Sequence, residues 1–196
     1  MVAGHGGRRH AALMEITSKH EFASYWEYVL DEAIFTAPAH PLWGGAVLIG
    51  NDGKLVGIGS LLIQERYEDD EIVDSNMSVP IDLLEPILDD LMKFGKIDKP
   101  PRPWLGLFTT ESDGNQVVAG LTEGAPADEA GLEAGDVVVR VADTQVSDLV
   151  QLFRRIWAEG PAGTVIPLTI ERDGDEMTLE VTSADRESFL KAPGLH

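Results

Sequence analysis

Short apolar runs, separated by glycine and charged residues, recur along most of the chain and predict a mainly β protein. Two runs near the C-terminal end are joined by Asp173-Gly174-Asp175, a sequence typical of a hairpin turn. Asn51-Asp52-Gly53 indicates a similar turn in the first half, with Gly53 at its left-handed position. The expected strands are residues 11–17, 21–30, 46–49, 54–58, 104–110, 116–121, 137–141, 165–172 and 177–182, with a polar loop at 64–74.

Two stretches instead place apolar residues three and four positions apart, which is the spacing of one helix face. Residues 83–94 form the first stretch, and Gly95 is its expected C-terminal cap. Pro86 costs this helix a hydrogen bond unless it lies in the first turn, which favours a start nearer Leu84. Residues 148–158 form the second, with Ser147 or Asp148 as the expected N-cap. The apolar face of this second helix carries Leu149, Leu152, Phe153 and Ile156.

A proline cluster, Pro100, Pro101 and Pro103, separates the two halves of the chain. Prolines remove backbone donors and favour an extended link, so we place a domain boundary here. The expected organisation is a mainly β first domain with a C-terminal helix over 1–98, an α/β domain over 99–185, and a loosely held tail over 186–196.

The chain carries 34 acidic and 15 basic side chains, and its net charge of −19 is spread over both halves. This charge disfavours nucleic acid and anionic membrane surfaces as partners, and no apolar run approaches the ~20 residues of a membrane span. Cysteine is absent, and the five histidines form no zinc-binding pair. We therefore expect no metal and no cofactor, and we interpret the acidic run 68–71 as a solvated loop.

The stretch most informative about function is 124–136, which reads Gly-Ala-Pro-Ala-Asp-Glu-Ala-Gly-Leu-Glu-Ala-Gly-Asp and precedes an apolar strand. Pro126 suits the start of a single helical turn, Gly131 suits the left-handed residue that ends it, and Gly135-Asp136 suits a second turn. This order of features resembles PDZ domains, in particular those of bacterial high-temperature-requirement (HtrA) serine proteases. The resemblance implies a domain that binds the free C-terminus of another chain.

The first half resembles the same family around its nucleophile. Residues 28–34, Gly44-Gly45 and 52–58 follow the family's order of an acidic-alanine strand, a glycine loop and a strand that ends in Val-Gly-Ile. The two resemblances together cover about residues 20–182. They imply a partial trypsin-like β-barrel, made of a second-barrel segment plus a helix, followed by a PDZ domain.

The position that aligns with the nucleophilic serine of that family is occupied by Trp43. No serine lies between Ser24 and Ser60, so a shifted alignment supplies none. The family's catalytic His and Asp lie in an N-terminal barrel that has no counterpart among these residues, and a triad needs all three groups within hydrogen-bond reach. We therefore expect no catalytic residues and no peptide cleavage. His40, in the loop that replaces the nucleophile loop, is interpreted as a surface or structural histidine rather than a catalytic one.

In PDZ domains a peptide adds a strand to the sheet edge, and its carboxylate sits on the N–H groups of a glycine-containing loop. The resemblance assigns the loop and the pocket for the terminal side chain to Trp104, Leu105, Gly106, Leu107, Leu149 and Phe153. The two helix residues are equally compatible with a place in the core. The expected partners are peptide or protein C-termini.

Three functions are compatible with these residues. The first is a peptide-binding module of an HtrA-like homologue that lacks a triad. The second is a fragment of a serine endopeptidase whose activity resides in another part, and the third is a structural module in which half a barrel pairs with another copy as a homo-oligomer. The family resemblance suggests the bacterial cell envelope, although residues 1–10 carry arginine without the apolar stretch of a signal peptide.

Overall fold

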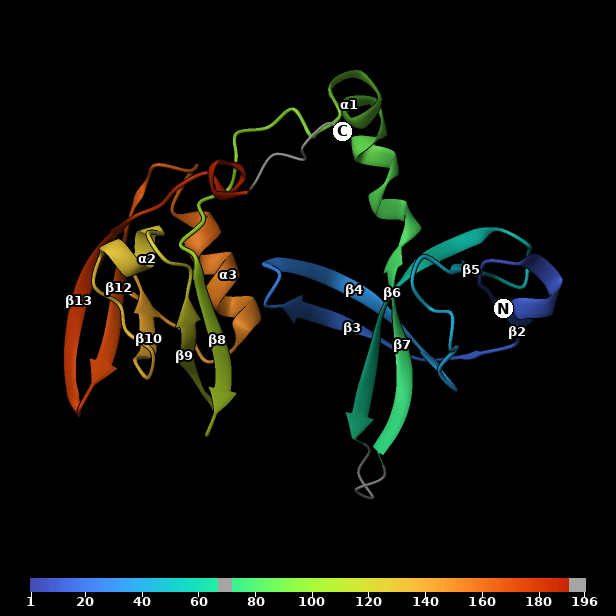
Figure 1. Ribbon diagram of the computed structural model, residues 1–196, viewed down its shortest axis with the longest axis horizontal. Coiled ribbons are helices and arrows are strands. Elements are labelled where there is room, and N and C mark those ends of the chain that lie inside the picture. Colours follow the sequence, from blue (N-terminus) through green and yellow to red (C-terminus); the bar gives the residue numbers. More distant parts are fainter. Residues whose placement is uncertain (67–71, 191–196) are drawn as a thin grey trace. The chain divides into compact units, whose positions relative to one another are not determined.

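The computed structural model describes residues 1–66 and 72–190, which are mainly β with a few short helices (Figure 1). The chain divides into two compact units. The first unit contains Met1–Phe22 and Leu30–Asp98, and the second contains Ala23–Val29 and the residues from Lys99 onward. The expected fold class, a β-sheet region followed by a compact domain with helices, is confirmed.

Seven strands form one sheet in the N-terminal half, in the order β2-β1-β5-β6-β7-β4-β3. Phe35 of β4 and Met77 of β7 are paired and are 1% and 0% exposed, and a buried apolar cluster is formed by Val2, Ile34, Ala46 and Leu48. The strands are β1 (Val2–Ala3), β2 (Ala11–Ala12), β3 (Glu15–Ser24), β4 (Tyr28–Ala37), β5 (Val47–Ile49), β6 (Leu55–Arg66) and β7 (Ile72–Pro80).

The first two expected strands, 11–17 and 21–30, have the wrong boundaries. β3 runs through to Ser24, and a tight turn then separates it from β4. The Glu27 N–H donates to the Ser24 carbonyl (2.8 Å), and Glu27 adopts a positive φ of 61°. The aromatic run was interpreted as one strand, but its middle is this turn.

The hairpin at Asn51-Asp52-Gly53 is confirmed: it joins β5 to β6, and Gly53 has φ 78°. The expected polar loop at 64–74 is wrong at both ends, because β6 continues to Arg66 and β7 begins at Ile72. Residues 67–71, which include most of the acidic run, lie outside the described residues.

The expected helix over 83–94 is broken into three short pieces. Two 3-10 turns, Ile81–Leu83 and Glu85–Ile87, precede α1 (Leu88–Phe94). Pro86 lies at the second of these turns and has no N–H to donate, which explains why a continuous helix does not form. Gly95 ends α1 with φ 71°, as expected.

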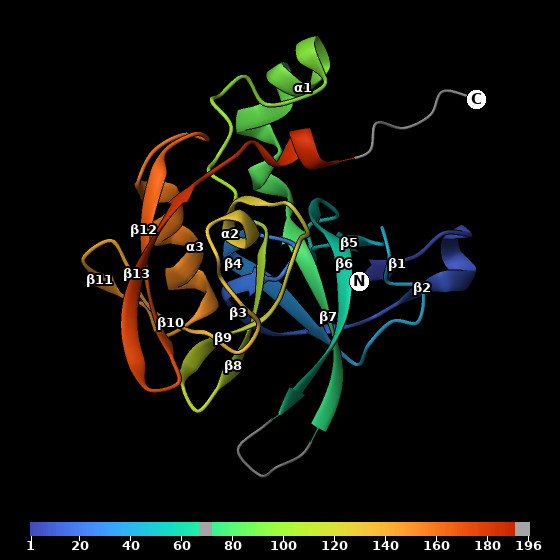
Figure 2. The same cartoon turned by 60° about the vertical axis from the view of Figure 1, so that its left-hand side comes forward.

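The second unit contains a sheet in the order β13-β12-β10-β9-β8, with β11 paired to β10 (Figure 2). Neighbouring strands of this sheet are antiparallel, and α3 lies against the sheet. The elements are β8 (Leu107–Ser112), β9 (Asn115–Leu121), α2 (Pro126–Glu129), β10 (Val137–Val141), β11 (Thr144–Gln145), α3 (Leu149–Ala158), β12 (Val165–Arg172) and β13 (Asp175–Thr182).

The turns of this unit form where the sequence predicts them. Gly131 follows α2 with φ 86°, and the Asp173-Gly174 hairpin has two positive φ values, 55° and 88°, as a type I′ turn requires. Asp148 is the N-cap of α3, where its carboxylate accepts from the Gln151 N–H (2.8 Å). Short-range turn chemistry therefore fixes most of this unit.

The segment after β13 is more ordered than expected. Asp185 caps a 3-10 helix at Arg186–Phe189, where a loosely held tail was predicted. The Phe189 ring packs 4.7 Å from the Trp104 ring, centroid to centroid, which ties the helix to the loop before β8. Residues 191–196 lie outside the described residues.

Candidate functional site

The sheet of the second unit ends at β8, whose outer backbone edge pairs with no strand among the described residues. The preceding loop, 104–107, is held by its carbonyl groups. Leu105 O accepts from the Ala127 N–H, and Gly106 O accepts from the Thr122 N–H, each at 2.8 Å. The loop is therefore fixed by bonds that use its acceptors.

Two backbone N–H groups of this loop make no hydrogen bond to the described residues. Within the described part of the chain, the backbone N–H groups of Leu105 and Gly106 donate to no protein atom. Both residues are buried, and unpaired N–H groups are costly in such surroundings. Adjacent backbone N–H groups without a partner are the kind of donors from which proteins build anion sites.

Gly106 is required at this loop for two reasons. Its φ of 75° lies in the left-handed region, which side chains with a Cβ disfavour. An added Cβ would also overlap the Ala125 methyl group and lie 2.9 Å from the Trp104 ring. A larger residue at position 106 would therefore strain the backbone and displace its neighbours.

Helix α3 presents two apolar stripes. Leu152 and Ile156 lie in the main core with 0% and 3% exposure, and the half-buried Leu149 packs against that core. Phe153 is 4% exposed but is not part of this core cluster; its ring stacks on Trp157 at 5.7 Å. Leu149 is thus partly a core residue, whereas Phe153 belongs to a separate aromatic stripe.

Trp157, which extends this stripe, and Arg102, which packs on the Trp157 ring, were not predicted from the sequence. Trp157 lies four residues after Phe153, so the same helical spacing that selected Leu149 and Phe153 extends to it. The Arg102 guanidinium lies 4.2 Å from the centre of the Trp157 ring. Arg102 could not be found from periodicity, because it precedes the loop and reaches α3 only in the fold.

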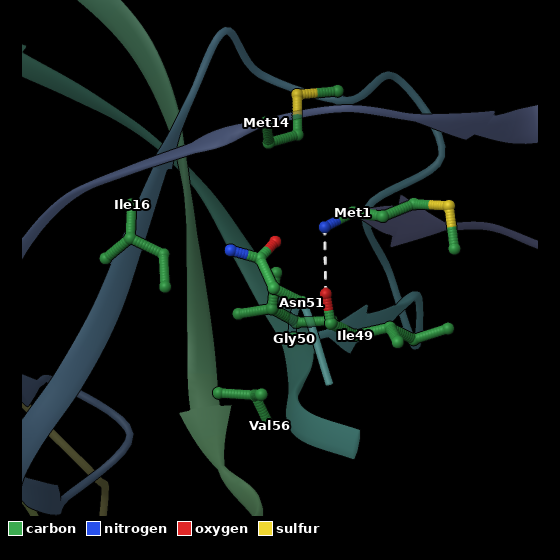
Figure 3. A pocket seen from close by; sticks show the side chains of 8 residues that line it. Met1, Met14, Ile16, Ile49, Gly50, Asn51 and Val56 are labelled. Carbon is green, nitrogen blue, oxygen red and sulfur yellow. Dashed lines mark hydrogen bonds between the residues drawn. The ribbon is translucent and has the colours of Figure 1, made fainter. Parts of the chain in front are cut away.

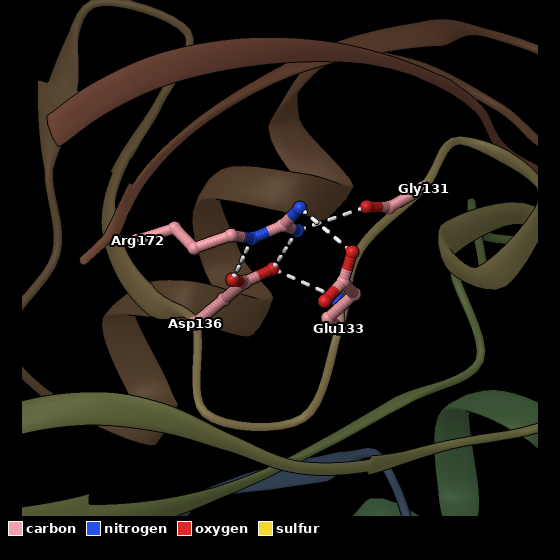
Figure 4. A network of polar contacts seen from close by, with 4 residues as sticks. All are labelled: Gly131, Glu133, Asp136 and Arg172. Carbon is pink, nitrogen blue, oxygen red and sulfur yellow. Dashed lines mark hydrogen bonds and ion pairs between the residues drawn. The ribbon is translucent and has the colours of Figure 1, made fainter.

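A buried ion pair holds the turn before β10 (Figure 4). Asp136, 1% exposed, accepts from Arg172 Nε (2.6 Å) and Nη2 (2.7 Å), and also from the Glu133 N–H (2.8 Å). Arg172 also donates to Glu133 Oε1 and to Gly131 O, each at 2.9 Å. One arginine at the end of β12 thereby fixes the turn that the sequence motif supplies.

The pKa of Asp136 reflects this network. Burial acts to raise it, but the hydrogen bonds from Arg172 and from the Glu133 N–H outweigh burial and hold the pKa below the ordinary value of 3.8. The carboxylate is therefore charged at neutral pH and provides the charge-assisted bonds that keep Gly131 and its neighbours in place.

In the first unit, Trp43 lies half-buried in the loop before β5, and its carbonyl accepts from the Ala46 N–H (2.9 Å). His40 is buried rather than on the surface, with 4% exposure. Its Nδ1 accepts from the Leu42 N–H (3.1 Å), so this nitrogen is occupied in a backbone turn. That contact agrees with the structural interpretation of His40.

An apolar cavity of about 290 Å³ lies beside β5 and β6 of the first unit (Figure 3). Met14, Ile16 and Val56 are among its walls, and no acidic, basic or histidine side chain lines it. The charged N-terminal amine of Met1 lies at this cavity and donates to the Ile49 carbonyl (2.9 Å).

No group of three or more His, Asp or Glu side chains is arranged to hold a metal ion in residues 1–66 and 72–190. Over the same residues, no helix has the length and apolar character needed to cross a membrane.

Comparison with known proteins defines the class of the second unit. Residues 103–182 match the model of the PDZ domain. The edge strand, the loop with free donors and the helix beside them therefore belong to a PDZ domain.

Similarity to individual proteins extends into the N-terminal half. The chain is 26% identical over 167 residues to the serine protease Do-like HtrA of Bacillus subtilis (strain 168), covering 77% of this chain and 36% of that protein. It is 30% identical over 173 residues to HtrA of Lactococcus lactis subsp. lactis (strain IL1403), covering 79% and 41%. The solved HtrA-type protease AlgW with tripeptide matches with a TM-score of 0.55 at 19% identity, over 87% of this chain and 58% of that one. The chain is thus a PDZ-containing homologue of the HtrA-like serine proteases, and it spans about two fifths or less of these curated relatives.

Proposed function

We propose that the chain binds the C-termini of peptides or proteins through its PDZ domain. The observation that carries the proposal is the pair of buried N–H groups of Leu105 and Gly106 beside the free edge of β8. Neither N–H group has a hydrogen-bond partner among the residues that the structure describes. A terminal carboxylate can accept from both groups while the preceding residues add a strand to β8. The solved structure of the HtrA-type protease AlgW, a protein of similar fold, is a structure with a tripeptide, which supports peptide binding.

The terminal side chain would enter between the start of β8 and α3. Leu149 and Phe153 would line this pocket from α3, with Trp157 four residues further along the helix, so an apolar surface would meet the ligand. An apolar last residue is therefore preferred. The net charge of −19 also favours peptides with basic residues upstream. Affinity is expected in the micromolar range, about −8 kcal/mol, because a few-residue strand buries little area.

We further propose that this chain is not itself a protease. Residues 25–59 contain no serine, and His40 is engaged with a backbone N–H. The resemblance of Gly44-Gly45 to the family's glycine pair implies that Trp43 takes the place of the nucleophile. A serine-type mechanism has no nucleophile to act with in this part of the chain. The HtrA-like half is then a scaffold joined to a peptide-binding domain.

Titration calorimetry of the full chain with a free-acid peptide tests the binding proposal. Leu149→Asp should weaken binding at least about tenfold, because a carboxylate would be placed against the apolar terminal side chain. Ala158→Asp is the matched control: it adds the same charge to an exposed position of the same helix and should change affinity less than about twofold. Equal affinities for the two variants would show that this face of α3 does not contact the ligand.

A further inference from the structure

The helical segment that follows β7, residues 81–97, leaves its apolar side chains uncovered. No residue of α1 or of the two 3-10 turns before it is buried in the described chain. Leu88, Met92 and Phe94 of α1 are 43%, 79% and 57% exposed, and Figure 1 shows the segment leading away from the end of β7. Contiguous exposed apolar surface of this kind marks an interaction site in soluble proteins.

The exposed leucines of this segment follow the spacing of a helix–helix seam. Leu84, Leu88 and Leu91 are four and three residues apart, which is the repeat at which one helix packs along another. Leu84 is 38% exposed and Leu91 is half-buried, so none of the three is used up in the core of the first unit. The segment therefore offers a short apolar stripe with room for a second helix.

Two contacts fix the end of this stripe. Gly95 closes α1 by donating its N–H to the Leu91 carbonyl (3.0 Å), and the Asp98 N–H donates to Asp90 Oδ2 (3.1 Å). These bonds hold the residues after α1 close to its last turn. The stripe is thus part of a folded segment with a defined end.

The charges of the segment are divided along its length. Its first half is acidic and its second half is basic, with Asp82, Glu85, Asp89 and Asp90 followed by Lys93, Lys96 and Lys99. Two copies placed side by side in parallel would bring like charges together. Two antiparallel copies would bring the lysine end of each onto the acidic end of the other, so the segment is complementary to itself in that arrangement.

We propose that residues 84–96 are a dimerisation surface, on which the same segment of a second copy of the chain packs antiparallel about a two-fold axis. Such an interface is isologous, because the same stripe is contributed by both copies. The leucines of the two stripes form the apolar centre, and Glu85 of each copy lies near Lys96 of the other. A second copy is favoured over an anionic membrane surface because the whole chain carries a net charge of −19.

The expected dimer is weak. Two helical segments of this length bury less than the ~1,200 Å² in total that stable interfaces exceed, so a Kd on the order of 100 µM is expected. Sedimentation equilibrium of the full chain, from about 10 µM to 1 mM, should follow a reversible monomer–dimer equilibrium. Leu88→Asp should raise the Kd at least about tenfold, because it places a carboxylate in the apolar centre of each copy.

Leu13→Asp is the matched control. It makes the same change at a leucine that is 86% exposed and lies outside the segment, and it should alter the Kd less than about twofold. If the circular dichroism spectrum of Leu88→Asp departs from that of the wild type, Met92→Asp takes its place, because Met92 is 79% exposed.

Charge reversal tests the antiparallel arrangement. Glu85→Lys and Lys96→Glu should each weaken the dimer about threefold, and the double variant should regain the wild-type Kd, because the two charges exchange places across the two-fold axis. A chain that stays monomeric at 1 mM overturns the proposal. So do equal effects of Leu88→Asp and Leu13→Asp, and so does a double variant that is as weak as either single one.

Discussion

Removing the Asp136 carboxylate should destabilise the PDZ domain more than removing an exposed charged group of the same network. The Asp136→Ala change removes three hydrogen bonds to a buried carboxylate, at 2.6, 2.7 and 2.8 Å. Loss of one partner of a buried ion pair typically costs 3–5 kcal/mol. Arg172 keeps its bonds to Glu133 and to Gly131 O, and its side chain is 25% exposed, so water can replace part of what it loses. We therefore expect a loss of about 3 kcal/mol at pH 7, at the lower end of that range.

Hydrogen exchange followed by mass spectrometry measures this loss in the full chain, through the opening free energy of amides in β10 and β12. A loss of about 3 kcal/mol corresponds to a fall in Tm of roughly 10–20 °C for a domain of this size. Glu133→Ala is the matched control: it removes a carboxylate that is 68% exposed, and it should cost less than about 1 kcal/mol. The reasoning is refuted if Asp136→Ala and Glu133→Ala cost the same.

The pH dependence of this difference has a definite sign. Because the pKa of Asp136 lies below its ordinary value of 3.8 in the folded state, the unfolded chain binds the proton first as pH falls. The stabilisation is present above that ordinary value and is lost as the pH falls through the lower, folded-state pKa. The difference between wild type and Asp136→Ala should therefore shrink in strong acid and stay constant from pH 5 to 7.

Two further predictions concern other parts of the chain. Burial raises the pKa of Glu27 to about 7, against the opposing charge of Arg186, so the folded chain holds a proton between about pH 4.5 and 7 that the unfolded chain has released. The contribution of the protonated Glu27 to stability is therefore complete below about pH 4.5 and declines as the pH rises toward 7. Urea denaturation at a series of pH values measures this decline, and Glu27→Gln should flatten it. An equally steep decline of stability with pH in Glu27→Gln would contradict the raised pKa. For the N-terminal half, incubation with casein and with a fluorophosphonate probe should give neither cleavage nor labelling. Specific labelling of any residue in 31–60 would overturn the proposed lack of a nucleophile.

Local turn chemistry allowed much of the PDZ domain to be predicted from the sequence. Gly131, the Asp173-Gly174 pair and the Asp148 cap each specify a backbone conformation within a few residues, and each forms as expected. The broken helix after β7 was not predicted, because the apolar spacing continued through Pro86 while the backbone could not. Strand ends near Glu27 were misplaced because an aromatic run can fill either a strand or a turn.

The candidate site was predictable only in part. Trp104, Leu105, Gly106 and Leu107 are assigned to the site by the resemblance of their sequence, and this assignment stays a prediction. The free donors of this loop became visible only with the hydrogen bonds of its neighbours. The 3-10 helix that brings Arg186 to the loop has no periodic pattern to mark it. Such contacts depend on long-range packing, which residue spacing alone does not encode.

The central claim, that a terminal carboxylate binds the loop before β8, is tested most directly by amide chemical shifts. In ¹H–¹⁵N spectra of the full chain, the Leu105 and Gly106 amides should move downfield when a peptide with an apolar last residue and a free carboxylate is added. The same peptide with a C-terminal amide should leave both signals in place at equal concentration. Downfield shifts of equal size with both peptides, or no shift of either amide with the free acid, would contradict the account.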